Sequence, residues 1–158
     1  SSAASDVYKR QRLFGSKVRI DNCEVKGIQG GISIESCQDA VISGGKYYTE
    51  NTPGEKDAFY PVYITNGAKV TITGGEFSAP NDWSGLQIEG TSAVVSGDND
   101  VNLPTGSVIL KGGKLSGKAY NTETKVVYEP AEGYKWQAID GAGNQPGDLK
   151  WEVVAQSL

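Results

Sequence analysis

The stretch Lys69-Val-Thr-Ile-Thr-Gly-Gly-Glu-Phe77 alternates apolar and polar residues, reaches a Gly-Gly pair and ends on a large apolar residue. Versions of the same pattern occur at Lys17–Val25, Asp39–Tyr47, Ser92–Gly97 and Ser107–Leu115. Alternation with a period of two is typical of a β-strand with one buried face, and paired glycines are typical of a tight turn. Each copy therefore predicts a short strand that runs into a sharp corner.

The copies recur at about the length of one coil of a repeat fold. Aligned on the residue two places before the corner, the first four copies are 22, 30 and 23 residues apart. The aligned residues are Ile20, Ile42, Ile72 and Val95. Self-similarity at this period predicts a solenoid, in which each coil packs on its neighbours.

A second strand precedes the corner strand in each coil. Three short runs, Ile32-Ser-Ile34, Val62-Tyr-Ile64 and Leu86-Gln-Ile88, end eight, eight and seven residues before the aligned position of the next copy. The connection from this strand to the corner strand is nearly constant in length, whereas the connection from the corner to the next coil varies. Surface loops tolerate insertions and packed corners do not. A long insertion between Tyr47 and Tyr60 predicts a protruding polar loop.

The corner motif with its preceding strand resembles the right-handed parallel β-helix of the pectin-lyase-like type. It is similar in particular to the repeat regions of large bacterial surface and secreted proteins. The resemblance covers about residues 17–115 and implies an all-β solenoid of about four to five coils. It selects no function, because this architecture carries enzymes, adhesins and phage fibres alike.

The first eleven residues resemble the translation of a transposon-end sequencing adapter, in which Asp6-Val-Tyr-Lys-Arg-Gln11 matches the transposon end. We therefore expect residues 1–11 to be a non-native tail, the alternative being a polar N-terminal arm. On this interpretation a signal peptide would lie in a missing N-terminal part, and its absence here carries no conclusion. The expected division is a tail at 1–11, β-helix repeats at 12–116 and a C-terminal cap at 117–158.

The charge and hydropathy of the chain disfavour two classes of partner. The formal net charge is −4, and it becomes −5 without residues 1–11, which carry two basic side chains and one acidic one. An acidic chain of this kind is not expected to bind nucleic acid, whose phosphates it would repel. No run approaches the roughly 18 apolar residues of a membrane-spanning helix, so no membrane span is predicted.

The absence of histidine removes several kinds of chemistry. With no imidazole in the chain, a Ser-His-Asp set, a Cys-His set and the usual histidine-containing zinc sites are excluded. The two cysteines, Cys23 and Cys37, are too few to close a zinc site. They form a disulfide only if neighbouring corners bring their Cα atoms within about 7 Å, and otherwise they pack as small buried residues. No cofactor is predicted.

Strand parity predicts the core, because alternate residues of a strand face the same side. A first inward ladder is expected from the corner strands, a second from the preceding strands and a third from the residues after the corner. The first contains Val18, Ile20, Ala40, Ile42, Val70, Ile72, Ala93 and Val95. The second contains Ile32, Ile34, Val62, Ile64, Leu86 and Ile88, and the third contains Val25, Tyr47 and Phe77.

The same parity sends two rows outward beside the second ladder. One row is expected to hold Ser33, Tyr63 and Gln87, and the next Glu35, Thr65 and Glu89. Glu35 and Glu89, two coils apart, would be separated by about 10 Å, at the upper end of the range of inverting glycosidases. They are the best catalytic pair in the sequence. The alternative is that both are ordinary carboxylates on a solvated face.

Two further features bear on catalysis and metal binding. Polysaccharide-cleaving β-helix proteins usually combine clustered aspartates with a catalytic Arg, Lys or His. Outside residues 1–11 the only arginines are Arg12 and Arg19, and no Asp-Asp pair occurs. Asp98-Asn-Asp100 places oxygen ligands at alternate positions, as a calcium loop does, but it lacks the loop's Gly and distant Glu. A polar turn is the alternative, and no metal site is predicted.

Aromatic residues give a more plausible binding surface. Tyr48, Tyr60, Tyr63 and Trp83 lie in or beside the longer loops, and parity sends Tyr63 outward. Exposed rings beside polar loops stack on sugar rings or anchor a protein partner. The alternative is that Tyr47, Phe59 and Tyr60 cover the open edge of the core.

After Leu115 the repeat pattern ends. Three strand-like runs follow at Lys125–Tyr128, Tyr134–Ile139 and Leu149–Val154, separated by turn signals. The end of a solenoid exposes unpaired backbone groups, so a cap is needed. Tyr134, Trp136 and Trp151 supply the apolar area for an antiparallel β cap, and the run from Pro130 to Trp136 resembles the closing hairpin of such surface proteins.

The sequence therefore predicts a non-enzymatic scaffold, adhesin-like or glycan-contacting module of a secreted or surface-exposed bacterial protein. Its partner would be a glycan or a host-surface protein. Two alternatives remain, a fragment of a polysaccharide lyase or glycoside hydrolase, and a segment of a phage fibre or spike. An enzyme is expected to gather carboxylates and a basic residue in one groove, whereas a display module is expected to show scattered charges and exposed rings.

Overall fold

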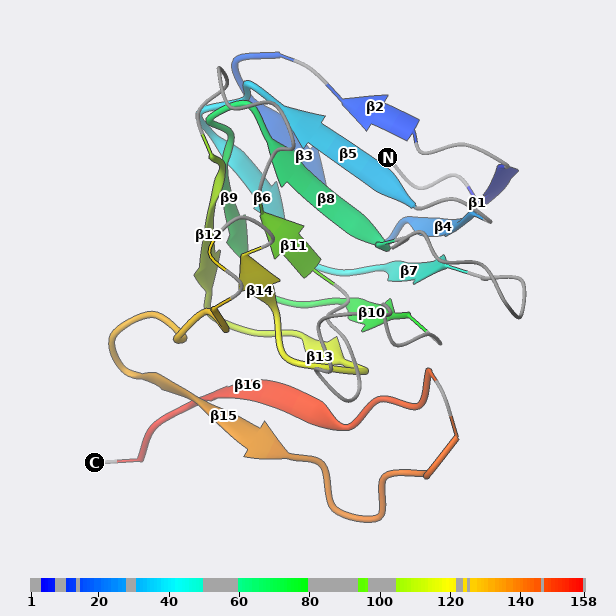
Figure 1. Cartoon of the computed structure of the whole chain (residues 1–158), viewed down its shortest axis with the longest axis vertical. Helices are drawn as coiled ribbons and strands as arrows, with labels where there is room; N and C mark the ends of the chain where they lie inside the picture. The colour runs from blue at the N-terminus through cyan, green and yellow to red at the C-terminus, as the bar shows by residue number, and fades with distance from the viewer. Residues whose placement is uncertain are drawn as a thin grey trace.

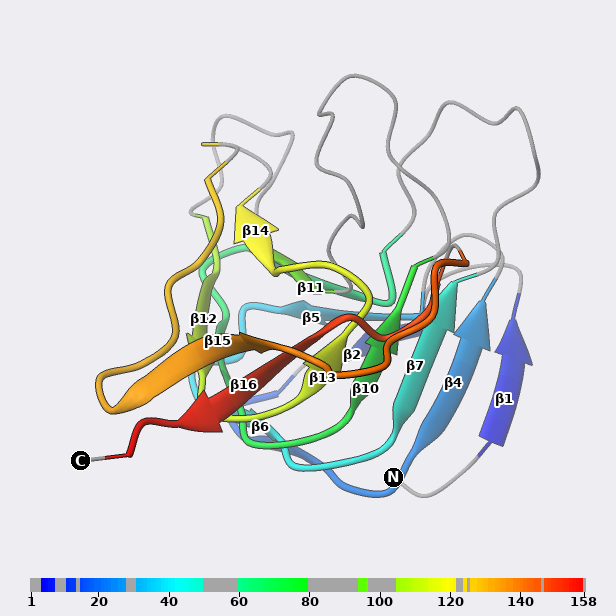
Figure 2. The same ribbon diagram turned by 90° about the horizontal axis from the view of Figure 1, so that it is seen from below.

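The computed structural model describes residues 4–7, 11–13, 15–27, 31–49, 60–79, 94–96, 105–121, 124, 126–145 and 147–157. These residues form strands and no helix, in three sheets that we call A, B and C. Figure 1 shows the strands stacked above one another, and Figure 2 shows the sheets as the sides of the coils. No helix in the described part of the chain is long and apolar enough to cross a membrane.

Sheet A has seven strands, of which the first five in spatial order run parallel. In spatial order they are β1 (Ala4–Val7), β4 (Glu24–Gly27), β7 (Lys46–Thr49), β10 (Glu76–Ser78), β13 (Lys114–Leu115), β16 (Trp151–Ala155) and β15 (Tyr134–Ala138). Residues 1–11 were expected to lie outside the fold, yet Ala4–Val7 pairs with β4. The adapter origin of these residues stays a prediction.

Sheets B and C are parallel throughout. Sheet B contains, in spatial order, β14 (Tyr120–Asn121), β11 (Val94–Ser96), β8 (Val62–Thr65), β5 (Ile32–Glu35) and β2 (Gln11–Leu13). Sheet C contains β12 (Ser107–Leu110), β9 (Lys69–Ile72), β6 (Ala40–Ile42) and β3 (Val18–Ile20). Each coil therefore passes through B, C and A in turn.

The core consists of ladders of stacked side chains, as the parity of the strands predicts. Ile20, Ile42 and Ile72 are in register on sheet C and at most 4% exposed. Ile32, Ile34, Val62 and Ile64 form the second ladder on sheet B. On sheet A the third ladder is Val25, Tyr47 and Phe77, joined by Leu115. The rings of Tyr47 and Phe77 are fully buried and stack with centroids 5.1 Å apart.

One prediction about the ladders is wrong. Ser92–Gly97 was expected to continue the ladder of sheet C with Ala93 and Val95, but its described part, β11, pairs with β8 of sheet B. The place on sheet C is taken by β12, whose Val108 and Leu110 lie in register with Val70 and Ile72. A two-residue period fits a strand of either sheet, so it does not tell which sheet the strand joins. Leu86 and Ile88 lie outside the described residues.

The Gly-Gly corners between sheets C and A are imposed by the stacking. A Cβ atom on Gly74 would lie 2.5 Å from the backbone oxygen of Ser43 in the coil below. The second glycine of the pair, Gly75, has φ +112°, a conformation that side chains rarely adopt. Gly112 and Gly113 repeat both features at the next corner, since a Cβ on Gly112 would meet the backbone oxygen of Thr73 and Gly113 has φ +101°. The first corner has Asn22 and Cys23 at these positions, so the pair is required only where the coils approach this closely.

The cysteines occupy two different corners, are buried and are not joined by a disulfide. Cys23 lies at the corner before β4, where its backbone oxygen accepts a hydrogen bond from Lys46 N. Cys37 lies at the corner after β5, where its backbone oxygen accepts from Lys69 N. Because the residues sit at different corners, the disulfide does not form, and the packing alternative is confirmed.

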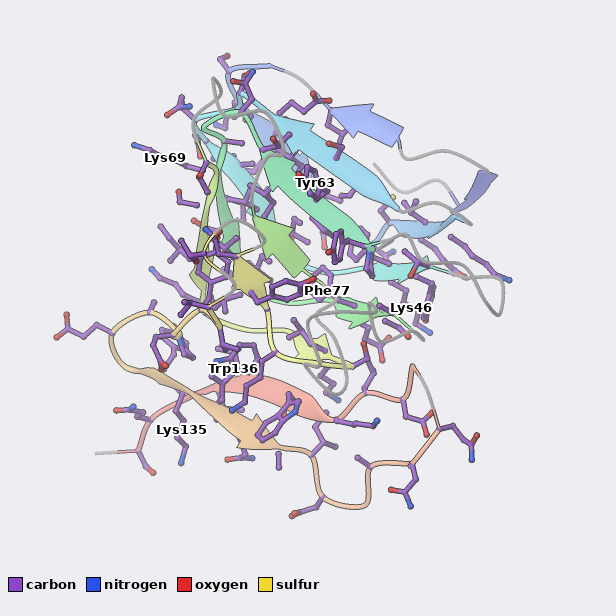
Figure 3. The ribbon with its side chains drawn as sticks, viewed as in Figure 1. Lys46, Tyr63, Lys69, Phe77, Lys135 and Trp136 are labelled. Atoms are coloured by element: carbon purple, nitrogen blue, oxygen red, sulfur yellow. The ribbon has the colours of Figure 1, made fainter. Side chains whose placement is uncertain are left out.

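The C-terminal segment forms the expected antiparallel cap. β15 and β16 make a hairpin, and β16 pairs antiparallel with β13, so it covers the edge of the last parallel strand of sheet A. Val153 joins the core, while Trp136 packs against it and donates from Nε1 to the backbone oxygen of Tyr128 at 2.9 Å. Figure 3 shows Trp136 on the side of β15 that faces the coils and Lys135 on the other side.

The junction between repeats and cap differs from the expectation. β14 lies beyond residue 116 but still pairs in parallel with β11, so the parallel stack extends past the expected boundary. A strand was expected over Lys125–Tyr128. Of its described residues, Val127 forms only an isolated bridge with Tyr120. Strand-like composition was insufficient here because a strand needs a continuous partner.

We expect Ile72→Ala to lower the free energy of unfolding by about 2–5 kcal/mol, because the side chain is fully buried in the ladder of sheet C. The matched control is Thr71→Ala on the same strand, where the side chain is partly exposed, with an expected loss below about 1 kcal/mol. Equilibrium urea denaturation measures both. Equal losses would contradict the parity assigned to β9.

Candidate ligand-binding face

The outer face of sheet A carries a row of charged side chains whose sign alternates from strand to strand. The register places Glu24 beside Lys46, Lys46 beside Glu76, and Glu76 beside Lys114. The antiparallel strand β16 adds Glu152 beside Lys114. We call these five residues the charge ladder. Neighbouring members stand about 4.8 Å apart, the spacing of strands in a sheet.

Alternation matters because parallel coils stack each residue on its equivalent. Identical coils would place like charges directly opposite each other, which destabilises a sheet, whereas opposite charges contribute roughly 0.2–1 kcal/mol per pair. Lys46 Nζ lies 3.9 Å from Glu76 Oε2, with side chains 55% and 35% exposed. Solvent screens such a pair, so the ladder acts more by avoiding repulsion than by strong attraction.

A groove runs along one side of the charge ladder, where the Gly-Gly corners enter sheet A. Its volume is about 420 Å³. The glycines form part of its lining because they carry no side chains, and charged residues stand beside them. Its lining consists of Thr73, Gly74, Gly75, Glu76, Lys111, Gly112, Gly113, Lys114, Glu152 and Val153. The corner that stacking requires is therefore also what hollows the surface.

Tyr48 lies on the other side of the charge ladder, two residues after Lys46 on the same outer face of β7. Its ring is partly exposed. Burial raises the pKa of the Tyr48 hydroxyl, and the carboxylates of Glu76 and Glu24 raise it further. The phenol therefore stays neutral at pH 7 and keeps its proton for hydrogen bonding. On the next strand Ser78 donates to the backbone oxygen of Gly147 at 2.7 Å, so the cap bounds this side.

Of the predicted aromatic residues, Tyr63 lies on β8 of sheet B and Tyr60 lies two residues before that strand, away from this face. Tyr60 is 5% exposed and stacks on Tyr63 with centroids 6.1 Å apart. Tyr120 donates from its hydroxyl to that of Tyr60 at 2.7 Å and is fully buried. This cluster fits the alternative that Tyr60 covers the core edge. Ligand binding by Tyr60 and Tyr63 stays a prediction, and Trp83 lies outside the described residues.

The outer rows of sheet B are less open than parity alone predicted. Ser33 and Tyr63 are in register as expected, and so are Glu35 and Thr65. Ser33 and Thr65, however, are 4% and 6% exposed, so the expectation of exterior rows is wrong at these positions. Parity tells which face a side chain takes but not whether another segment covers that face. On this face Tyr63 packs against the buried Tyr60.

Several predicted site residues cannot be compared with the structure. Glu89, Asp98 and Asp100 lie outside the described residues, as does Gln87. The pairing of Glu35 with Glu89 therefore stays a prediction. Within the described ranges no group of three or more His, Cys, Asp or Glu side chains is placed to hold a metal ion.

The charge ladder was missed in the sequence, although part of it was visible. The residue directly after each corner is Glu24, Lys46, Glu76 and Lys114, an alternation of sign at one repeat position. Glu152 has no such signal, because it enters the row from the antiparallel cap. Figure 3 shows Lys46 of sheet A and Lys69 of sheet C projecting from opposite sides of the solenoid, so the outer faces of sheets A and C are separate.

Three parallel sheets joined by tight corners and closed by a hairpin define a parallel β-helix. The family described as right-handed β-helix region matches residues 12–113 of this chain. The match spans more than half of the 158 residues, and the chain belongs to this family. No curated protein and no solved structure matched the chain.

We expect Lys46→Glu to lower the free energy of unfolding by about 0.5–1 kcal/mol at low salt, because it places three carboxylates side by side. About 1 M salt, with a Debye length of roughly 3 Å, is expected to recover most of the loss. Lys135→Glu is the control with the same change in net charge. Lys135 lies beside Val154, and its loss is expected within about 0.5 kcal/mol. A salt-independent loss at Lys46 would contradict the electrostatic explanation.

Proposed function

We propose that this β-helix is a non-enzymatic display module of a secreted or surface-exposed bacterial protein, and that it contacts glycans through the outer face of sheet A. The observation that carries the proposal is the charge ladder with a groove on one side and the ring of Tyr48 on the other. Sugar recognition uses this combination, since rings pack on the apolar faces of sugars and charged groups bond their hydroxyls.

The rigidity of the face supports a role in display. The strands that carry Lys46 and Glu76 also carry Tyr47 and Phe77, which are fully buried and stacked. Each outward side chain is thus attached to a backbone held by the core and by pairing on both sides. A surface organised before binding loses less conformational entropy when a ligand arrives.

The same groove favours one second candidate, a glycan-cleaving enzyme. Glu76 and Glu152 stand on either side of Lys114, about 10 Å apart by strand spacing, and Lys111 lines the same groove. Two carboxylates with lysines in one groove are the arrangement expected of an enzyme, and this spacing is at the upper end for inverting glycosidases. Against it, Lys111 and Lys114 are exposed, whereas a catalytic lysine base is normally desolvated.

Removing the Tyr48 ring tests the proposed face. We expect Tyr48→Ala to weaken binding to a responsive member of a soluble glycan panel about fivefold or more, because an aromatic ring packed on a ligand contributes about 1 kcal/mol or more. Tyr63→Ala on sheet B is the matched control and is expected to retain binding within about twofold. Affinity electrophoresis on the full chain measures both. Loss in Tyr63→Ala with retention in Tyr48→Ala would move the site to sheet B.

Release of reducing ends, followed with the same glycans, separates display from catalysis. We expect none from the wild-type chain. Release that disappears in Glu76→Gln, with the fold retained by circular dichroism, would overturn the non-enzymatic assignment and support the second candidate.

A further inference from the structure

The groove beside the charge ladder has balanced charge. Its lining contains two carboxylates, Glu76 and Glu152, and two ammonium groups, Lys111 and Lys114. Resting on the proposed function, we infer that this groove selects a neutral polysaccharide over an acidic one, and that the sugar chain lies across the strands, parallel to the charge ladder. The inference concerns the class of glycan and its direction, neither of which follows from glycan contact alone.

Two lysines of the charge ladder that could attract an acidic sugar, Lys114 and Lys46, are flanked by carboxylates. Lys114 has Glu76 on one side and Glu152 on the other, each in direct register. Lys46 lies between Glu24 and Glu76 and forms an ion pair with Glu76. A sugar carboxylate that approaches either ammonium group meets a like charge about 4.8 Å away on both sides. The net charge of −4 also repels polyanions at longer range.

A neutral sugar fits the same row because a hydroxyl both donates and accepts hydrogen bonds. Carboxylates only accept and ammonium groups only donate, so an alternating row offers every hydroxyl a partner. Hydrogen bonds to charged groups are roughly twice as strong as those between neutral groups. The alternation that keeps the coils from repelling each other thus also creates a surface suited to polyols.

The direction of the sugar chain follows from the spacing of the charge ladder. Successive members of the charge ladder are about 4.8 Å apart, close to the length of one sugar unit in an extended polysaccharide. A chain that runs across the strands meets a charged side chain at each unit, whereas a chain that runs along one strand meets only one member of the charge ladder. The groove follows the same direction, since Gly74-Gly75 and Gly112-Gly113 line it from successive coils.

The test uses one neutral polysaccharide before and after oxidation of its primary hydroxyls to carboxylates, so that only charge differs. Soluble glucans, galactans and mannans supply such pairs, and affinity electrophoresis of the full chain gives both affinities. We expect the wild-type chain to bind a neutral polymer at least tenfold more tightly than its oxidised form. Preference for the oxidised form would overturn the inference and leave glycan contact standing, whereas binding to neither form of any pair would overturn both.

The double variant Glu76→Gln with Glu152→Gln tests the cause. It removes the flanking carboxylates with little change in shape, and we expect affinity for the oxidised polymer to rise at least tenfold and to fall again at high salt. The control is Glu129→Gln with Glu132→Gln, two exposed glutamates outside the groove lining that change the net charge equally. A similar rise in the control, or no rise in the groove variant, would show that the flanking carboxylates do not set the preference.

Discussion

In-register stacking of parallel strands is the constraint on which the rest of this molecule depends. Each coil places Ile42 on Ile20 and Ile72 on Ile42, so one position in the coil is repeated through the core. Backbone pairing with the coils above and below satisfies the strands, and the buried ladders supply the apolar driving force. Any residue that is acceptable once must also be acceptable beside its own equivalents. That requirement acts differently at the core, at the corner and on the surface.

At the corner the constraint selects glycine, and on the surface it selects alternating charge. The backbone of one coil approaches the next too closely for a Cβ on Gly74, as its distance to the Ser43 oxygen shows. The resulting strip without side chains is part of the lining of the groove. Next to it, like charges at one repeat position would repel, and Glu24, Lys46, Glu76 and Lys114 avoid this by changing sign. The proposed binding face is thus a product of the same rules that build the fold.

The cap and the aromatic cluster determine which faces remain open. Tyr60, Tyr63 and Tyr120 pack together on sheet B, where the sequence had suggested exposed rings. On sheet A the hairpin extends the face by adding Glu152 to the charge ladder and Val153 to the groove. Its connecting loop bounds the neighbourhood of Tyr48 through the hydrogen bond from Ser78 to Gly147. The outer face of sheet B, which strand parity predicted to be exposed, is partly covered, and the proposed binding face lies on sheet A instead.

The sequence by itself determined the repeat, the parity of the strands and the need for a cap. These follow from local rules, because a two-residue period sets which side chains share a face and a Gly-Gly pair marks a corner. Ile72 and Phe77 were therefore assigned correctly to the core. Only the tertiary structure decided that β11 joins sheet B and β12 continues sheet C, that Tyr60 is buried, and that Glu152 completes the charge ladder. These outcomes depend on which segments, distant in the sequence, pair at the edge of a sheet or cover its outer face. No periodicity within a strand carries that information.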